Sequence, residues 1–137
     1  MRKILILSSG IILLCGIVAG MLAVPPAQNV VVTINGNPET GGVDPPWFVL
    51  SKSGKDTVRW QNELNLPCTI TFGLQSPFLT EPVEIGPLGT HSALTPEKAP
   101  NPPKGWDKTR PNDVYVVYKY SVKCGLATFD PGGGIKP

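Results

Sequence analysis

The chain has 137 residues, with 12 basic and 10 acidic side chains and a formal net charge of +2. This length is enough for one domain. When Arg2 and Lys3 are set aside, the rest of the chain has 10 basic and 10 acidic residues and is formally neutral. A neutral balance gives no support for nucleic acid or an anionic membrane surface as a partner.

Residues 1–24 are predicted to be an export signal or a membrane anchor. Residues 4–24 are almost entirely apolar, and Arg2 and Lys3 precede them. A basic start before an apolar run is typical of an export signal, and this run is close to the ~20 residues that span a bilayer as a helix. Two outcomes stay open. Cleavage near Gly20 or Ala23 would release the protein, and an uncleaved apolar helix would tether it. Either outcome predicts an extracytoplasmic protein, secreted or periplasmic, that meets the membrane only through this segment.

Three cysteines are present, and Cys15 lies in the apolar segment. The exported part therefore keeps one pair, Cys68 and Cys124. In an oxidising compartment such a pair favours a disulfide. The bond would close a loop of about 57 residues, which chain entropy values at ~4 kcal/mol. A free or metal-binding pair of thiols is the alternative.

The first half of the exported chain predicts short strands between turns. Residues 25–28 form a Pro-rich spacer, and residues 29–34, NVVVTI, are typical of a strand. Further strands are predicted at residues 47–50, 56–61 and 68–72. The last of these alternates, with Cys68, Ile70 and Phe72 on one face. The strand tryptophans Trp47 and Trp60 are expected in the core.

Periodicity is lost in residues 73–111, which we call the Pro-rich excursion. Eight of the 16 prolines fall between Pro77 and Pro111, and they exclude long helices and central strands. A short strand is predicted at residues 82–85. Because long irregular segments in compact domains often carry function, the excursion is the first place to look for a partner surface. The candidate residues on it are Trp106, His91, Lys104 and Lys108.

The C-terminal part contains the longest predicted strand, residues 113–123. Its even-numbered residues, which include Tyr118 and Tyr120, form an apolar face, and the opposite face is more polar apart from Val117. Residues 125–137 predict a turn and a short last strand. The run of glycines at 132–134 argues against a strong terminal strand. Short strands separated by turn signals predict an all-β, antiparallel sandwich for residues 29–137.

Two segments resemble the cupredoxin family of plastocyanin- and azurin-like copper proteins. The first is SGKDTVRWQN followed by NLPCTITF, at residues 53–62 and 65–72. The second is YKYSVKC, at residues 118–124, which is similar to the strand that delivers the family's cysteine ligand. The resemblance implies a Greek-key sandwich with Cys68 in place of a ligand histidine. Immunoglobulin-like sandwiches share the strand-tryptophan pattern and are the alternative fold.

The departures from that family bear on the chemistry. A blue-copper site needs two imidazoles and a thiolate, and the chain has one histidine. Both methionines, Met1 and Met21, lie in the N-terminal segment. The resemblance therefore implies a sandwich without copper or another cofactor, in which Cys68 and Cys124 lie on neighbouring strands.

No local motif predicts catalysis. His91 lies in a loop, and Ser92 beside it has none of the sequence that surrounds a serine nucleophile. We therefore expect a non-enzymatic extracytoplasmic binding or structural module, with a protein or a cell-envelope component as its partner. The alternative from another class is a Cu(I)-binding or redox protein that uses Cys68 and Cys124 as thiols.

Overall fold

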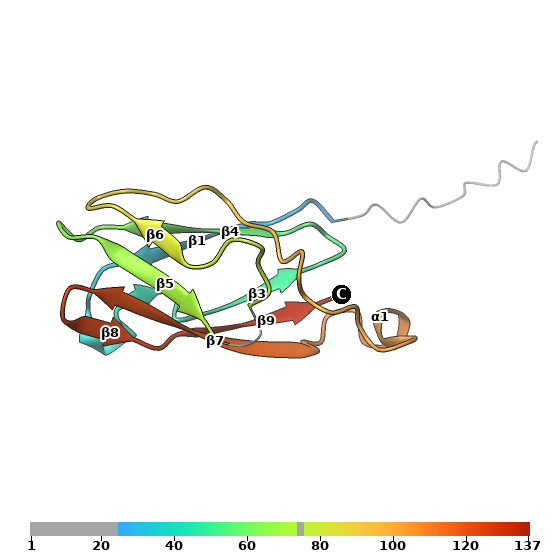
Figure 1. The fold of residues 1–137 in the computed structure, drawn as a ribbon. Coiled ribbons are helices and arrows are strands. Elements are labelled where there is room, and N and C mark those ends of the chain that lie inside the picture. The colour runs from blue at the N-terminus through green and yellow to red at the C-terminus, as the bar shows by residue number, and fades with distance from the viewer. Residues whose placement is uncertain (1–24, 74–75) are drawn as a thin grey trace, which may run out of the picture.

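The computed structural model describes residues 25–73 and 76–137, and these form a mostly β structure (Figure 1). The predicted N-terminal helix and the signal or anchor segment lie outside the described residues. The elements are β1 (Asn29–Ile34), η1 (Pro38–Thr40), β2 (Val43–Asp44), β3 (Trp47–Ser51), β4 (Thr57–Asn62), β5 (Cys68–Phe72), β6 (Val83–Ile85), α1 (Trp106–Thr109), β7 (Val116–Cys124), β8 (Ala127–Phe129) and β9 (Gly132–Lys136).

The strands form two sheets that enclose one core. The smaller sheet has the order β2-β1-β4, and the larger has the order β3-β9-β7-β5-β6, with β8 paired to β7. The all-β sandwich is therefore confirmed, but the expectation of purely antiparallel pairing was wrong. β1 runs parallel to β4, and β3 runs parallel to β9. Parallel partners need long connections, and here the chain leaves one sheet and crosses to the other before it returns.

The strands that the sequence predicted alternate between buried and exposed side chains. β1, β4 and β5 bury every second side chain, and the buried set on β5 is Cys68, Ile70 and Phe72. On β7, Tyr118 and Tyr120 point into the core, whereas Val117 is exposed. Because successive side chains of a strand point to opposite faces, this pattern fixes which face of each sheet is buried.

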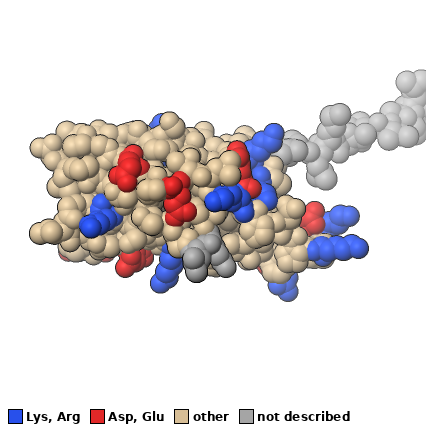
Figure 2. Space-filling view, in the orientation of Figure 1, with Lys and Arg blue, Asp and Glu red and all other residues tan. Residues whose placement is uncertain are grey.

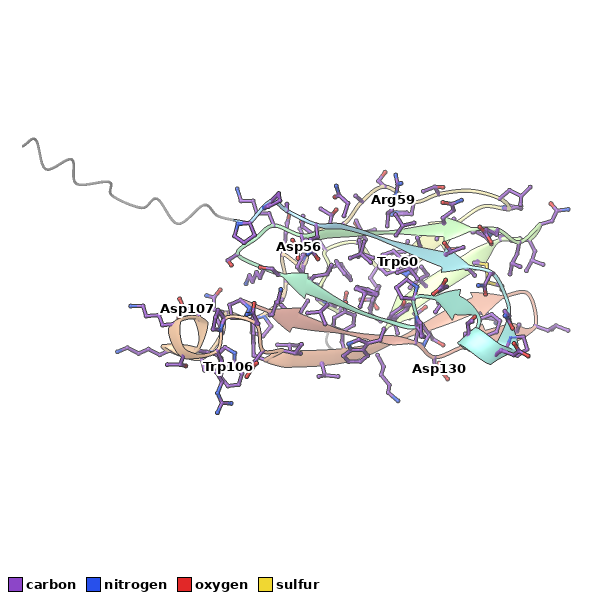
Figure 3. All side chains as sticks on the ribbon, turned by 180° about the vertical axis from the view of Figure 1, so that it is seen from behind. Asp56, Arg59, Trp60, Trp106, Asp107 and Asp130 are labelled. Atoms are coloured by element: carbon purple, nitrogen blue, oxygen red, sulfur yellow. A yellow bond between two sulfur atoms is a disulfide. The ribbon has the colours of Figure 1, made fainter. Side chains whose placement is uncertain are left out.

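An aromatic cluster fills the space between the sheets. Figure 3 shows Trp60 between the two layers, and its ring lies 5.8 Å from those of Phe72, Phe78 and Tyr120. Tyr118 is also buried, and its hydroxyl has no hydrogen-bond partner among the described residues. Burial raises the pKa of Tyr118, and the nearby Tyr120 raises it further. The cluster is the structural centre of the domain.

Trp47 does not join this core, so the expectation that it is buried was wrong. Its side chain is 46% exposed, and its ring lies over Gly132 of β9. Trp47 is the first residue of β3, where the alternation places Phe48 and Leu50 inward instead. An aromatic ring on the outer face covers backbone that a glycine leaves bare.

The run of glycines is not a weak end of the fold. β9 lies between β3 and β7, and Gly132, Gly133 and Gly134 are all buried. A Cβ atom built on Gly133 would lie 2.6 Å from the hydroxyl oxygen of Tyr118. Glycine therefore serves here to let large neighbours pack directly against the strand. The prediction of a weak terminal strand was wrong because it considered the propensity of the strand alone.

The Pro-rich excursion is ordered where the structure describes it. It contains the predicted short strand as β6, and Phe78 is buried in the core. It then runs beside β4, where Val58 exchanges backbone hydrogen bonds of 2.9 and 2.8 Å with Leu94. The four-residue helix α1 was not expected from the sequence. Its length of one turn gives no periodic signal to detect.

Candidate functional site

A disulfide joins Cys68 and Cys124 at one end of the sandwich. The two residues lie directly opposite each other on β5 and β7, with their Cα atoms 4.3 Å apart. This spacing is typical of a non-hydrogen-bonded antiparallel pair, in which side chains come closest. Both residues are buried, at 0% and 3% exposure. The bond therefore stabilises the edge of the core and is shielded from solvent.

Asn62, the last residue of β4, holds the loops beside the disulfide. Its side chain is buried, and its amide nitrogen donates to the carbonyl oxygens of Leu66 at 2.7 Å and Gly86 at 3.0 Å. Its carbonyl oxygen accepts from the backbone N–H of Leu64 at 2.9 Å. The backbone N–H of Leu88 also donates to the carbonyl of Leu64 at 2.9 Å. One polar side chain thus ties loop 63–67 to loop 86–90.

These loops present leucines to solvent. Leu66 is 36% exposed, Leu88 is 67% exposed, and Leu126 at the β7–β8 turn is fully exposed. Leu66 lies 3.4 Å from the place where a Cβ of Gly125 would be, so it borders that turn. We call Leu66, Leu88 and Leu126 the leucine pole. Large apolar side chains grouped at one end of a small domain are typical of a contact surface.

The backbone and the charge of the leucine pole have two further features. Leu88 has a φ of +52°, a left-handed conformation that costs about 1 kcal/mol or more for an L-residue with a side chain, and Lys55 at the opposite end has a similar φ of +57°. The loops at this end, residues 35–42, 63–67, 86–90 and 125–127, contain no lysine or arginine and two acidic residues, Glu39 and Glu63. These loops are therefore apolar with two carboxylates, and the exposed Lys123 of β7 lies beside the turn that carries Leu126.

The residues predicted from the sequence do not form one surface. His91 lies beside β4, where its backbone N–H donates to the carbonyl of Trp60 at 3.0 Å. Its Nδ1 contacts the carbonyl oxygen of the adjacent Ser92 at 2.7 Å. Trp106 lies in α1, which projects from one end of the sandwich (Figures 1 and 3). Lys104 and Lys108 are exposed around that helix. The structure separates His91 from the other three.

Trp106 is half-buried rather than fully exposed. Its indole Nε1 lies 3.5 Å from the carbonyl oxygen of Asp113, and the Arg110 guanidinium lies 5.0 Å from the centre of its ring. A cation at this distance over a tryptophan face is attracted by the ring. Trp106, Arg110, Lys104 and Lys108 therefore form one local group around α1.

A groove of about 1060 Å³ lies between the ends of β5 and β7 and the excursion. It is lined by Phe72, Pro77, Ala99, Tyr115 and Val117, among others. Two of its polar side chains are hydrogen-bonded to backbone: Glu81 accepts from the backbone N–H of Phe72 at 2.9 Å, and the Tyr115 hydroxyl donates to the Pro100 carbonyl at 2.7 Å. Among the described residues that line it, the groove brings together no set of side chains that is typical of catalysis.

Within residues 25–73 and 76–137, no three His, Cys, Asp or Glu side chains are placed to hold a metal ion. None of the helices in these same ranges is long and apolar enough to cross a membrane. No known protein-family model matches the chain, and no curated protein shows significant similarity to it. The surface chemistry at the two ends of the sandwich is therefore the basis on which a function can be proposed.

Sequence reasoning did not identify the leucine pole. Each of its leucines sits among turn-forming residues, in the triplets NLP, PLG and GLA. Turns at the surface ordinarily carry polar residues and glycine. A leucine at the centre of each of three turn signals was therefore the available clue. The sequence alone does not show that these three turns lie at the same end of the sandwich.

Proposed function

We propose that this protein is a non-enzymatic, extracytoplasmic binding module that docks a partner protein through the leucine pole. The observation that carries the proposal is the grouping of Leu66, Leu88 and Leu126 over loops that a buried disulfide and Asn62 hold in place. Contact residues held by a rigid support lose little conformational entropy when they bind. The Pro-rich excursion contributes one residue, Leu88, to this proposed contact surface.

The proposed architecture is a cupredoxin-like Greek-key sandwich without copper. The first segment that resembles that family spans β4, the following turn and β5, and Cys68 lies opposite Cys124 on the neighbouring strand β7. An immunoglobulin-like domain carries its characteristic disulfide between its two sheets. Here the bridge joins neighbouring strands of a single sheet, which favours the cupredoxin-like alternative.

The chemistry of the pole specifies the kind of partner. Leucines at the centre would fill an apolar depression on the partner. Glu39 and Glu63, in the loops around them, would face a basic rim, because complementary charges set orientation and association rate. We therefore propose a protein with an apolar depression that is bordered by lysine or arginine.

A matched pair of substitutions tests this site in the full-length chain. Leu88→Ser removes an exposed leucine of the pole, and Leu79→Ser removes one of similar exposure, 65%, outside it. A photo-crosslinking residue placed at Leu126 would capture the partner in intact cells, with the same residue at Lys119 as the reference. We expect Leu88→Ser to weaken capture about tenfold or more, because central apolar contacts dominate interface energy.

The same experiment can refute the proposal. Equal capture from Leu126 and Lys119 would show that the adduct forms by chance contact. An equal effect of Leu88→Ser and Leu79→Ser would show that the pole has no special role. Because both leucines are exposed, neither substitution is expected to change stability by more than about 0.5 kcal/mol.

The alternative, a Cu(I)-binding protein, requires both thiols in reduced form. Soft sulfur ligands suit Cu(I), but the two sulfur atoms are bonded to each other and buried. Mass spectrometry of the mature protein, with alkylation before and after reduction, separates the two proposals. Two free thiols together with stoichiometric copper would replace the binding module with the copper protein.

A further inference from the structure

The end of the sandwich that carries α1 collects most of the positive charge. The turn at 52–56, the segment 97–113 and Lys136 contain seven lysine or arginine residues and four aspartate or glutamate residues, a balance of +3. On the face that Figure 2 draws, more lysine and arginine side chains lie toward the end that carries α1 than toward the opposite end. The basic residues are Lys52, Lys55, Lys98, Lys104, Lys108, Arg110 and Lys136. Residues 25–137 are formally neutral as a whole, but their basic side chains are concentrated at one end of the domain.

The chain enters the domain at this same end. Pro25 and Pro26 line one cleft together with Asp107 and Pro111, the residues in and just after α1. The backbone N–H of Gln28 donates to Asp56 at 2.8 Å, so the spacer is fixed to the domain from there on. A Pro-rich spacer spans about 3.1 Å per residue. If a bilayer held residues 4–24, only a few residues of chain would therefore separate its surface from the end of the domain that carries α1.

The side chains around α1 suit a bilayer surface. Tryptophan is enriched at the membrane–water interface, and juxtamembrane lysine and arginine are attracted to anionic lipids. Trp106 is half-buried and stacks with Arg110, while Lys104 and Lys108 are exposed beside it. Two carboxylates, Asp107 and Asp113, oppose this attraction. Asp56 is buried and accepts two backbone N–H groups, so it does not face a membrane.

We infer that this end of the domain is a membrane-contact surface, with Trp106 at the bilayer interface and Lys104, Lys108 and Arg110 against anionic lipid headgroups. The inference depends on retention of residues 4–24 as an anchor and is independent of the partner at the leucine pole. It extends the sequence-based expectation, in which only the N-terminal segment met the membrane. It also orients the molecule, because the leucine pole then points away from the bilayer.

The full chain, with residues 1–24, can be reconstituted into two kinds of vesicle. One is phosphatidylcholine alone, and the other is phosphatidylcholine with an equal amount of phosphatidylglycerol. Both carry bromine at shallow acyl-chain positions, which quenches nearby tryptophan fluorescence. The difference between the parent chain and Trp106→Phe isolates the signal of Trp106. We expect quenching of Trp106 in the anionic vesicles and its release in about 1 M NaCl, where the Debye length is about 3 Å.

A matched pair of double variants supplies the control. Lys104→Gln with Lys108→Gln should lower the ratio of docked to undocked domain about 25-fold, or about fivefold for each lysine near the surface. Lys119→Gln with Lys123→Gln removes the same charge from exposed positions on β7 and should leave the ratio unchanged. Equal quenching in both kinds of vesicle, no quenching in either, or equal effects of the two double variants would each overturn the inference.

Discussion

The two ends of this sandwich share one core and differ in almost every other respect. The leucine pole has loops without lysine or arginine and presents apolar side chains. The basic end has a balance of +3 and presents lysines around a half-buried tryptophan. The net charge of a chain is therefore an average over surfaces that differ from one another in charge and polarity. A chain with equal numbers of acidic and basic residues can still carry two separate contact chemistries.

The ends also differ in how their loops are held. At the leucine pole a disulfide and a neutral amide, Asn62, fix the loops. At the basic end the carboxylate of Asp56 accepts from the backbone N–H groups of Gln28 and Ser51, each at 2.8 Å. The Lys52 ammonium reaches across to Asn101 at 3.1 Å. Substitutions can therefore destabilise the loops of one end without changing the contacts that hold the other end.

Removal of the disulfide should have the largest effect. We expect the double variant Cys68→Ala with Cys124→Ala to lose about 4 kcal/mol of unfolding free energy, because the unfolded chain regains the entropy of a loop of about 57 residues. Urea unfolding measures the loss. Hydrogen exchange should show the opening first at the leucine pole, with the basic end protected until global unfolding. Equal loss of protection at both ends would contradict the separation of the two ends.

Asn62→Ala should have the next largest effect. It leaves the carbonyl oxygens of Leu66 and Gly86 and the N–H of Leu64 without this partner, and we expect a loss of about 3 kcal/mol. The loops at the pole should exchange amide protons faster. Capture of the partner should weaken even though no leucine has changed. Unchanged capture would show that Asn62 does not position the pole.

Asp56→Asn is the corresponding change at the basic end. An amide keeps one acceptor oxygen, so one of the two backbone N–H groups now faces an NH₂ group. We expect a loss of about 2 kcal/mol, since hydrogen bonds to a charged group are the stronger kind. Proteolysis at residues 25–28 should accelerate while the leucine pole keeps its partner. Weaker partner capture in this variant would contradict the independence of the two ends.

The sequence allowed much of the fold to be predicted because alternation is a local signal. β4, β5 and β7 were predicted from their period-two patterns and β1 from its β-branched residues, and all four occur within a few residues of the expected positions. β9 was underestimated because its strength comes from neighbours: Tyr118 and Trp47 cover its glycines. Trp47 was misplaced because the face of a strand's first residue depends on tertiary packing.

The surfaces were harder to predict, for a physical reason. Exposed leucines at residues 66, 88 and 126 gain meaning only through proximity, and they come from three turns far apart in the chain. The sequence indicates Lys104 and Lys108 as candidate surface residues, but only the fold shows that they lie near the chain entry at Pro25. Local patterns specify strands, whereas the grouping of surface side chains depends on topology.

Tyr118→Phe should have the smallest effect at neutral pH, and it lies in the core between the two ends. The Tyr118 hydroxyl is buried and has no hydrogen-bond partner among the described residues. Its removal should therefore change stability by less than about 1 kcal/mol and can even stabilise, because a buried unpaired hydroxyl is costly. Neither partner capture nor membrane contact should change. A loss of several kcal/mol would show that the hydroxyl has a partner in solution.

Alkaline pH gives the same substitution a second readout. Burial, with a contribution from Tyr120, raises the pKa of Tyr118 well above its ordinary value of 10.0. Above pH 10 the unfolded chain releases this proton while the native protein keeps it. Stability is therefore complete below pH 10 and falls as pH rises further, by up to about 1.4 kcal/mol per pH unit for each such tyrosine. Tyr118→Phe should remove one tyrosine's share of that slope, and an unchanged slope would place the ionising group elsewhere.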